Sequence, residues 1–253
     1  MMIDAYLARI GYTGPRTATL DVLRALHERH LLTVPFENLD IHWKRAIVMD
    51  SDRFVAKVVD ARRGGFCYEL NGAFAELLRA LGFEVTLHSA RVASANGGFG
   101  PPFDHMALIV HLHDGTRWLA DVGFGESFLL PLNLDERGEQ SDRAGTYRLL
   151  DDGDEVRYQL KRDGAFADEY LLSLEPHPLQ DFAAMCDHQQ YAPESHFRKK
   201  RVCSLATKDG RVTLTDGKLV STRDGVREET ALTDDEWARV LHERFGIRQG
   251  DFA

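Results

Sequence analysis

The chain has 253 residues, 43% of them apolar and 28% charged, so it is long enough to bury a core in one large domain or a few small ones. Its 31 Lys and Arg against 40 Asp and Glu give a net charge of −9, the opposite of the basic footprint that nucleic acids and anionic membranes require. No signal peptide or long apolar span is evident, and three cysteines are too few for a disulfide scaffold. We expect a cytoplasmic protein without a nucleic-acid or membrane partner.

The N-terminal third of the chain predicts helices. Leucines recur at a spacing of three over residues 20–26 with polar residues between them, which is typical of an amphipathic helix. A second helix is expected to begin with Ser51 as its N-cap. A third helix carries apolar residues on one face over 70–81 and ends at Gly82. We therefore expect a compact helical unit over residues 1–82.

Beyond the third helix the pattern changes to strands. Residues 83–88 alternate between apolar and polar, 106–110 form a buried apolar run, and a turn at 113–116 leads into a return strand at 118–120. Further Asp-Gly turn signals follow, each beside a short β-rich run. This spacing favours antiparallel β-structure closed into a barrel, which we expect over 83–190.

The C-terminal part combines short strands with a last helix. Thr233 and Glu236 form a capping box, which is a signal for the start of a helix. We expect an α/β unit over 191–253. The loop over 93–102 is the longest Gly- and Pro-rich stretch of the chain, and long loops in compact domains are often functional.

Cys67 is the most informative single residue. It follows Gly64, Gly65 and Phe66 and stands at the start of the third predicted helix. A thiol in this place faces free N–H groups and the positive end of the helix dipole, which favour the thiolate. The same N–H groups could receive the oxyanion of a tetrahedral acyl intermediate. The alternative is an inert buried thiol, since free cysteine is commonly a core residue.

A nucleophilic thiol needs a base, and a predicted hairpin supplies one. His105 begins the apolar strand and Asp121 ends the return strand, so the two residues are near-opposite or offset by a few positions. A carboxylate beside a histidine fixes the imidazole tautomer and stabilises its protonated form. Alternatively, Asp121 is a turn residue and His105 is one of eleven histidines. Together with Cys67, the pair forms a Cys-His-Asp hypothesis.

Four segments resemble the signatures of the arylamine N-acetyltransferases. RGGFCYELN (63–71) resembles the active-site signature of that family, and VPFENL (34–39) resembles its second signature. DHMAL (104–108) and WLADVGFG (118–125) match its His and Asp segments in the same order. PESHF (193–197) is similar to the Pro-x-Ser-x-Phe stretch of bacterial members, although Tyr-Ala replaces the small hydroxyl residues that usually precede it.

The resemblance implies an α+β protein in three parts: a helical bundle over 1–82, an antiparallel β-barrel over 83–190 and an α/β lid over 191–253, with a cysteine-protease-like Cys-His-Asp site. It implies ping-pong transfer of an acetyl group from acetyl-CoA, through a thioester on Cys67, to an arylamine, hydrazine or arylhydroxylamine. His105 would be the base and Asp121 its partner. We expect a short, bacterial-type member that is a monomer or a weak homo-oligomer.

Binding residues follow from the same segments. An arylamine is neutral and needs an apolar slot, for which the candidate walls are Phe36, Phe66 and Phe124, although an aromatic ring taken alone is more often a core residue. Backbone N–H groups of the glycine-rich loop could receive CoA phosphates, and the candidate cofactor-binding residues are Gly97, Gly98, Phe99, Gly100 and Phe197. The basic run at 198–201 leaves room for a further phosphate contact.

Other polar residues near these motifs are expected to be structural. Glu37 and Arg63 lie in apolar or glycine-rich surroundings and predict a buried ion pair that fixes the loop before Cys67, with Asn38 beside them. The remaining Cys and His side chains near the C-terminal part match no standard zinc spacing, so no metal is expected; they are Cys186, His188, His196 and Cys203.

Three other functions are compatible with parts of this pattern. A papain-like peptidase or a transglutaminase uses the same nucleophile and the same order of residues. An amide synthase that closes macrocyclic polyketides would replace acetyl-CoA by a carrier-bound chain. A catalytically silent binding or scaffold protein is the third alternative, against which the intact Cys67, His105 and Asp121 argue.

Overall fold

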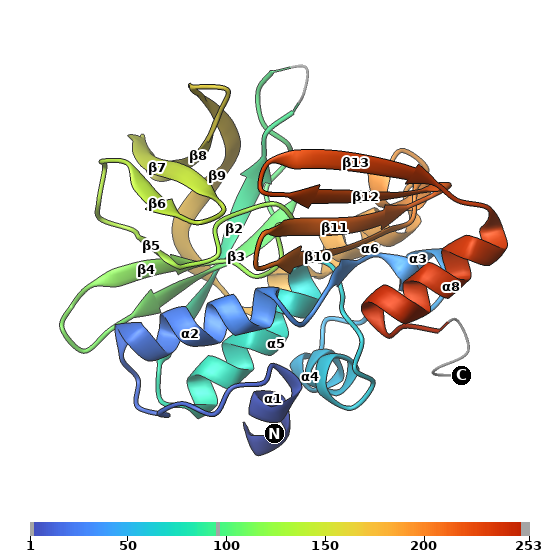
Figure 1. Ribbon diagram of the computed structural model, residues 1–253. Coiled ribbons are helices and arrows are strands. Elements are labelled where there is room, and N and C mark those ends of the chain that lie inside the picture. Colours follow the sequence, from blue (N-terminus) through green and yellow to red (C-terminus); the bar gives the residue numbers. More distant parts are fainter. Residues whose placement is uncertain (1–2, 95–96, 249–253) are drawn as a thin grey trace.

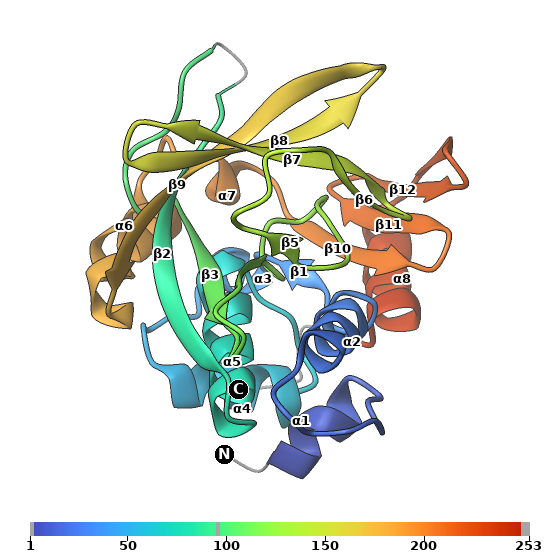
Figure 2. The ribbon, with the colours of Figure 1, turned by 90° about the vertical axis from the view of Figure 1, so that its left-hand side faces the viewer.

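The computed structural model describes residues 3–94 and 97–248, which form a helical part, a strongly curved sheet and a smaller sheet with its own helix (Figures 1 and 2). The helices of the N-terminal part include α1 and α4, which pack on α5, and α5 lies against the curved sheet (Figure 1). Their bounds are α1 (Ile3–Arg9), α2 (Leu20–Leu31), α3 (Leu39–His42), α4 (Ser51–Val59) and α5 (Cys67–Ala80).

Local sequence signals set the starts of these helices. The side chain of Thr19 accepts the N–H of Val22 and caps α2. The N-cap of α4 is Asp50, whose carboxylate accepts the N–H of Arg53 at 3.1 Å, so the prediction of Ser51 as the cap is wrong by one residue. Asp and Ser are equally good N-caps, so helix-capping preference alone does not decide between the adjacent residues Asp50 and Ser51. Helix α5 begins at Cys67, as predicted.

The curved sheet has eight antiparallel strands in the order β5-β4-β3-β2-β9-β8-β7-β6. It is a nearly closed barrel (Figure 2). Its interior is rich in aromatic side chains. Its edge strands are joined by one side chain: Gln140 accepts the N–H of Asn133 at 2.7 Å and donates to its carbonyl at 3.0 Å. The bounds are β2 (Glu84–Val92), β3 (His105–His111), β4 (Arg117–Ala120), β5 (Leu132–Asn133), β6 (Gln140–Asp142), β7 (Gly145–Asp152), β8 (Glu155–Arg162) and β9 (Ala165–His177).

The second sheet has five antiparallel strands in the order β1-β10-β11-β12-β13. Its first strand, β1 (Phe36–Glu37), comes from the N-terminal part and pairs with β10. This pairing joins the C-terminal sheet to the part of the chain that carries Cys67. Helix α8 packs on β10 and β11, and the capping box of Thr233 and Glu236 is present. The bounds are β10 (Val202–Thr207), β11 (Gly210–Thr215), β12 (Lys218–Arg223), β13 (Val226–Ala231) and α8 (Asp234–Phe245).

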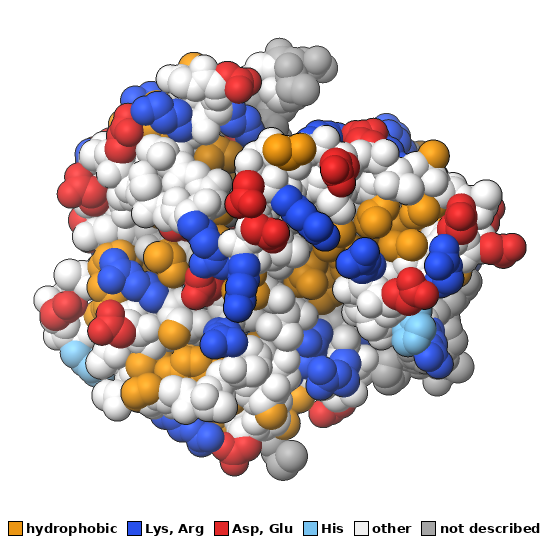
Figure 3. Space-filling model, viewed as in Figure 1, with side chains coloured by type: hydrophobic (Ala, Val, Ile, Leu, Met, Phe, Trp, Pro, Cys, Tyr) orange, Lys and Arg blue, Asp and Glu red, His pale blue; other side chains and the backbone are white. Residues whose placement is uncertain are grey.

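Between the two sheets the chain is helical. After β9 come η1 (Leu179–Phe182), α6 (Ala183–Tyr191) and α7 (His196–Lys199). The domain boundary predicted between residues 82 and 83 falls in the turn before β2. The boundary predicted between residues 190 and 191 falls inside α6. The division into three domains stays a prediction. No helix in 3–94 or 97–248 has the length and apolar character needed to cross a membrane. On the face in Figure 3, acidic and basic side chains are interspersed.

Candidate active site

Backbone packing delivers Cys67 to the first position of α5. Gly64 passes so close to the preceding segment that a Cβ there would lie 1.8 Å from the carbonyl oxygen of Pro35, so a side chain is excluded. At the helix start, the carboxylate of Glu69 accepts the N–H of Phe66 at 3.1 Å. The Cys67 side chain is 3% exposed. The thiol is thus held at a helix N-terminus, below the surface.

The hairpin brings His105 and Asp121 together. Leu108 pairs with Ala120, so Asp121 continues the register opposite Ala107, on the same face as His105 and diagonal to it. His105 Nε2 and Asp121 Oδ2 are 2.7 Å apart, and both side chains are buried. Since a carboxylate only accepts hydrogen bonds, Nε2 carries the proton and Nδ1 is left as the basic nitrogen.

Asp121 is held in its ionised form by its other partners. Its Oδ1 accepts the side-chain N–H of Asn71 and the backbone N–H of Gly123, each at 2.9 Å. Burial would raise the pKa of Asp121, but His105, Asn71 and the Gly123 N–H together bring that pKa below its ordinary value. The carboxylate can therefore stabilise a positive charge on His105.

Two of the residues that position Asp121 carried no role in the sequence analysis. Asn71 lies one helical turn after Cys67, donates to Met106 O at 2.6 Å as well as to Asp121, and accepts the N–H of Val122 at 2.9 Å. The ring of His27 on α2 accepts the N–H of Asp121 at 3.0 Å. The i, i+4 spacing from Cys67 could have indicated Asn71. Nothing in the sequence pairs His27 with residue 121.

Burial governs the ionisation of Cys67 itself. Desolvation raises the pKa of the Cys67 thiol well above its usual range, and the backbone N–H of Met106 offsets only part of that rise. The helix N-terminus was expected to favour the thiolate, but at this depth desolvation is the larger effect. Ionisation of the thiol therefore requires a nearby acceptor for its proton.

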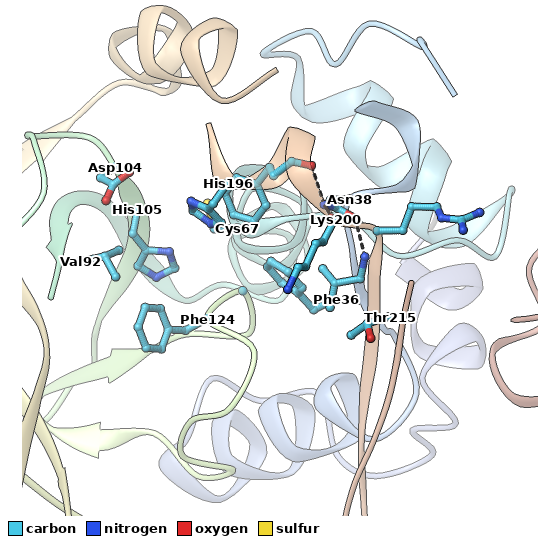
Figure 4. A pocket seen from close by; sticks show the side chains of 14 residues that line it. Phe36, Asn38, Cys67, Val92, Asp104, His105, Phe124, His196, Lys200 and Thr215 are labelled. Atoms are coloured by element: carbon cyan, nitrogen blue, oxygen red, sulfur yellow. Dashed lines mark hydrogen bonds between the residues drawn. The ribbon is translucent and has the colours of Figure 1, made fainter. Parts of the chain in front are cut away.

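Cys67 and His105 line the same cavity, which has a volume of about 500 Å³ (Figure 4). The loop after Asp121 closes one side of it: a Cβ on Gly123 would lie 2.7 Å from Cys67 Cα, so only glycine allows this approach. The described residues around the cavity are Phe36, Asn38, Cys67, Val92, Asp104, His105, Gly123, Phe124, His196, Phe197, Lys200, Arg201, Val202 and Thr215.

Two of the three predicted wall aromatics line this cavity. Phe124 packs edge-on against the His105 ring at 5.0 Å, and Phe36 lies 6.2 Å from Phe197, which also lines the cavity. Phe66 is fully buried and lies behind Phe197, with their centroids 5.7 Å apart. Phe66, the N-cap of α5, is not among the described residues that line the cavity, and its expected role in the wall stays a prediction.

None of the described residues of the glycine-rich loop, 93–94 and 97–102, lines this cavity. Ala95 and Asn96 are outside the described residues. Gly97 and Gly98 both have positive φ, the N–H of Gly97 donates to Ser94 O at 3.0 Å, and the N–H of Gly100 donates to Val92 O at 2.8 Å. Two of the expected phosphate donors are thus engaged within the loop. A phosphate role for Gly97, Gly98, Phe99 and Gly100 stays a prediction.

The predicted ion pair of Glu37 and Arg63 is present. Arg63 Nη2 lies 2.6 Å from Glu37 Oε1, and both side chains are buried. The pair belongs to a larger buried cluster, since Lys57 Nζ lies 2.7 Å from both Asp40 Oδ2 and Glu69 Oε1. Because Glu69 also binds the N–H of Phe66, this cluster holds the turn that presents Cys67.

Asn38 fastens the C-terminal part to the cavity rim. Its side chain donates to the carbonyls of Phe197 and Lys200, both at 2.8 Å, and accepts the N–H of Val202 at 2.8 Å (Figure 4). The cysteines and histidines weighed as a zinc site do not gather. Within the described part of the chain, no group of three or more His, Cys, Asp or Glu side chains could hold a metal.

Comparison with known proteins decides the family. The sequence model of the N-acetyltransferase family matches residues 19–251. The arylamine N-acetyltransferase of Escherichia coli (strain K12) is 35% identical over 254 residues, covering 99% of this chain and 90% of that protein. The chain belongs to the arylamine N-acetyltransferase family. It is therefore an acyltransferase, and the resemblance seen in its motifs is confirmed.

Solved structures of the family share this fold. The chain matches an N-arylamine acetyltransferase of Mycobacterium smegmatis with a TM-score of 0.94 and 32% identity, covering 100% of this chain and 95% of that one. It matches the arylamine N-acetyltransferase of Mycobacterium marinum, solved in complex with CoA, with a TM-score of 0.91 and 31% identity, covering 98% and 96%. Family membership sets aside the peptidase and transglutaminase alternatives.

Proposed function

We propose that this acetyltransferase works by a ping-pong mechanism in which Cys67 carries the acetyl group from acetyl-CoA to an arylamine, hydrazine or arylhydroxylamine. The observation that carries the proposal is the meeting of Cys67 with the His105–Asp121 pair around one cavity. A thioester donor and an amine acceptor share no binding geometry. A covalent acyl-enzyme lets one pocket serve both in turn.

In the first half-reaction, His105 Nδ1 takes the Cys67 proton as the sulfur attacks the acetyl carbonyl carbon. Burial disfavours a lone thiolate, so proton transfer to the imidazole and attack are coupled, and Asp121 stabilises the imidazolium that results. The N–H groups of the first turn of α5 have no partners within the helix and are available to the oxyanion. The C–S bond to CoA then breaks, and the CoA sulfur leaves with the proton from His105.

In the second half-reaction, the amine nitrogen attacks the same carbonyl carbon. His105 removes a proton from the nitrogen, the bond from the acetyl carbon to Cys67 breaks, and the sulfur regains a proton from the imidazolium. Phe36 and Phe124 supply apolar walls for the aromatic ring of the acceptor. Each turnover thus returns the free thiol and one N-acetylated product.

For the donor, the proposal uses the C-terminal side of the cavity. Phe197 and the exposed Lys200 come from the segment that Asn38 fastens to the rim, and both line the cavity. An ammonium group there is suited to a phosphate of CoA, against a net charge of −9 for the whole chain. The family uses acetyl-CoA as its acetyl donor, and the M. marinum structure contains CoA.

Steady-state kinetics tests the mechanism. Initial rates measured over a grid of acetyl-CoA and arylamine concentrations should give parallel double-reciprocal lines, with N-acetylarylamine as the product. Acetyl-CoA should also exchange its CoA with labelled CoA in the absence of any amine. Intersecting lines together with no exchange would show a ternary complex and refute the acyl-enzyme.

A further inference from the structure

The charges around the cavity are separated to opposite sides of Cys67. Asp104 is the only carboxylate among the described lining residues, and it lies on the side of His105 and Val92. Lys200 lies on the other side, with Cys67 between it and Asp104 in this view (Figure 4). Arg201, the next residue in the chain, also lines the cavity and forms an ion pair with Asp216. Ligands of opposite charge are therefore drawn to different ends of one cavity.

Two uncharged donors hold the Asp104 carboxylate, and the titratable side chains that act on it are His105, His196 and His188. Its Oδ1 accepts the side-chain amide of Gln189 on α6 at 2.7 Å, and the backbone N–H of Val92 is a second donor. The half-buried carboxylate is therefore positioned without a lysine or arginine against it. Such a charge acts strongly on a neighbouring ligand because little water screens it.

The negative side of the cavity is suited to the acceptor rather than to the donor. CoA carries phosphates, which favour the side of Lys200 and are repelled by Asp104. The acceptor must reach the same acyl carbon next to His105, the direct neighbour of Asp104 in the chain, and Phe124 packs on that imidazole. In Figure 4, His105 lies between Phe124 and Asp104, and all three line the cavity, so an acceptor ring against Phe124 would lie at the same end of the cavity as Asp104.

We propose that Asp104 is a specificity-determining residue that favours acceptor amines with a cationic or hydrogen-bond-donating second substituent and disfavours acceptors with a carboxylate. This inference rests on the proposed acetyl transfer through Cys67. Asp104 takes no part in the covalent steps. Its action is on the substituent that lies away from the reacting nitrogen.

The test uses three anilines of similar shape: 4-aminobenzoate as the anion, 4-aminobenzamide as the neutral compound and 4-aminobenzylamine as the cation. Wild type and Asp104→Asn are first acetylated with acetyl-CoA, and the rate of deacetylation by each aniline is measured in single turnovers. The assay is run at pH about 8, because burial raises the pKa of Asp104 and an alkaline buffer keeps it ionised. The asparagine retains an oxygen that can accept the bond from Gln189.

We expect Asp104→Asn to lower the cation-to-anion rate ratio about 10-fold, the order of magnitude for losing one partly screened charge interaction. Effects of the variant on His105 are common to all three anilines and cancel in the ratio. Gln189→Ala is the matched control, since it removes a positioning bond and keeps the charge. It should leave the ratio within a factor of about two of wild type.

Three results would overturn the inference. One is an unchanged ratio in an Asp104→Asn enzyme that is still acetylated on Cys67. Another is an equal change in Gln189→Ala, which would make the effect one of packing. If Asp104→Asn does not fold, wild type decides: its cation-to-anion ratio should fall as ionic strength rises, and a salt-independent ratio refutes the charge effect. Failure of wild type to form any acetyl-enzyme would instead refute the proposed function itself.

Discussion

Replacement of Asp121 by asparagine tests the hydrogen-bond geometry of the site. Oδ1 of Asp121 accepts bonds from Asn71 and Gly123, and an amide oxygen can keep both. The amide nitrogen then takes the place of Oδ2, 2.7 Å from His105 Nε2, where it can only donate. Nε2 must lose its proton and Nδ1 must gain one, so the nitrogen that should accept the thiol proton is already occupied.

The expected loss is large in rate and small in stability. The same substitution in a serine triad lowers the rate on the order of 10⁴-fold, which corresponds to about 5.4 kcal/mol, and we expect a comparable fall in Cys67 acetylation. Because two of the three bonds of the carboxylate survive, the free energy of unfolding should fall by only about 1–2 kcal/mol. Rapid-quench mass spectrometry gives the rate, and urea denaturation gives the stability. A folded Asp121→Asn enzyme with near-normal acetylation would refute the tautomer argument.

Three further predictions concern other parts of the site. Phe124→Ala should slow acetyl transfer to bulky arylamines by a factor that corresponds to up to about 1.5–3 kcal/mol, and it should leave the rate of Cys67 acetylation nearly unchanged. Stopped-flow measurements give the rates of the two half-reactions separately, and an equal fall in both rates would contradict the prediction. In His105→Ala, iodoacetamide should modify Cys67 only at alkaline pH, because burial raises the pKa of a thiol that has no base beside it. A variant that reacts as fast as wild type at neutral pH would contradict this prediction. Burial raises the pKa of Glu69 from 4.5 to about 7, so the folded state binds the Glu69 proton more tightly than the unfolded state does. Relative to Glu69→Gln, wild type should therefore lose up to about 3 kcal/mol of unfolding free energy as the pH rises from 4.5 to about 7. Parallel pH profiles of the two proteins in urea denaturation would contradict this prediction.

The residues proposed as catalytic could be located from the sequence because local signals place each of them. Cys67 follows a glycine pair at a helix start, and a single hairpin fixes His105 and Asp121 to within two register positions. A hairpin leaves few possible registers, so chemistry on its two strands is predictable. The family motifs added the substrate class to this geometry.

The lining of the cavity was less predictable because tertiary contacts decide which side chains reach it. Phe66 and Phe36 stand in similar apolar signatures, yet only Phe36 reaches the cavity, since Phe66 caps α5 and turns into the core. The side chain of Asn38 donates a hydrogen bond to the carbonyl of Lys200, and this contact between distant parts of the sequence depends on the pairing of β1 with β10. The depth that raises the pKa of Cys67 is likewise a property of the packed molecule.

Intact-mass spectrometry of the enzyme mixed with acetyl-CoA alone shows whether Cys67 carries the acetyl group. We expect one acetyl adduct, mapped to Cys67 by peptide analysis, absent in Cys67→Ser and lost when an arylamine is added. Cys186 and Cys203 are buried free thiols and serve as internal controls. An adduct that persists in Cys67→Ser, or that maps to either of those cysteines, would contradict the account.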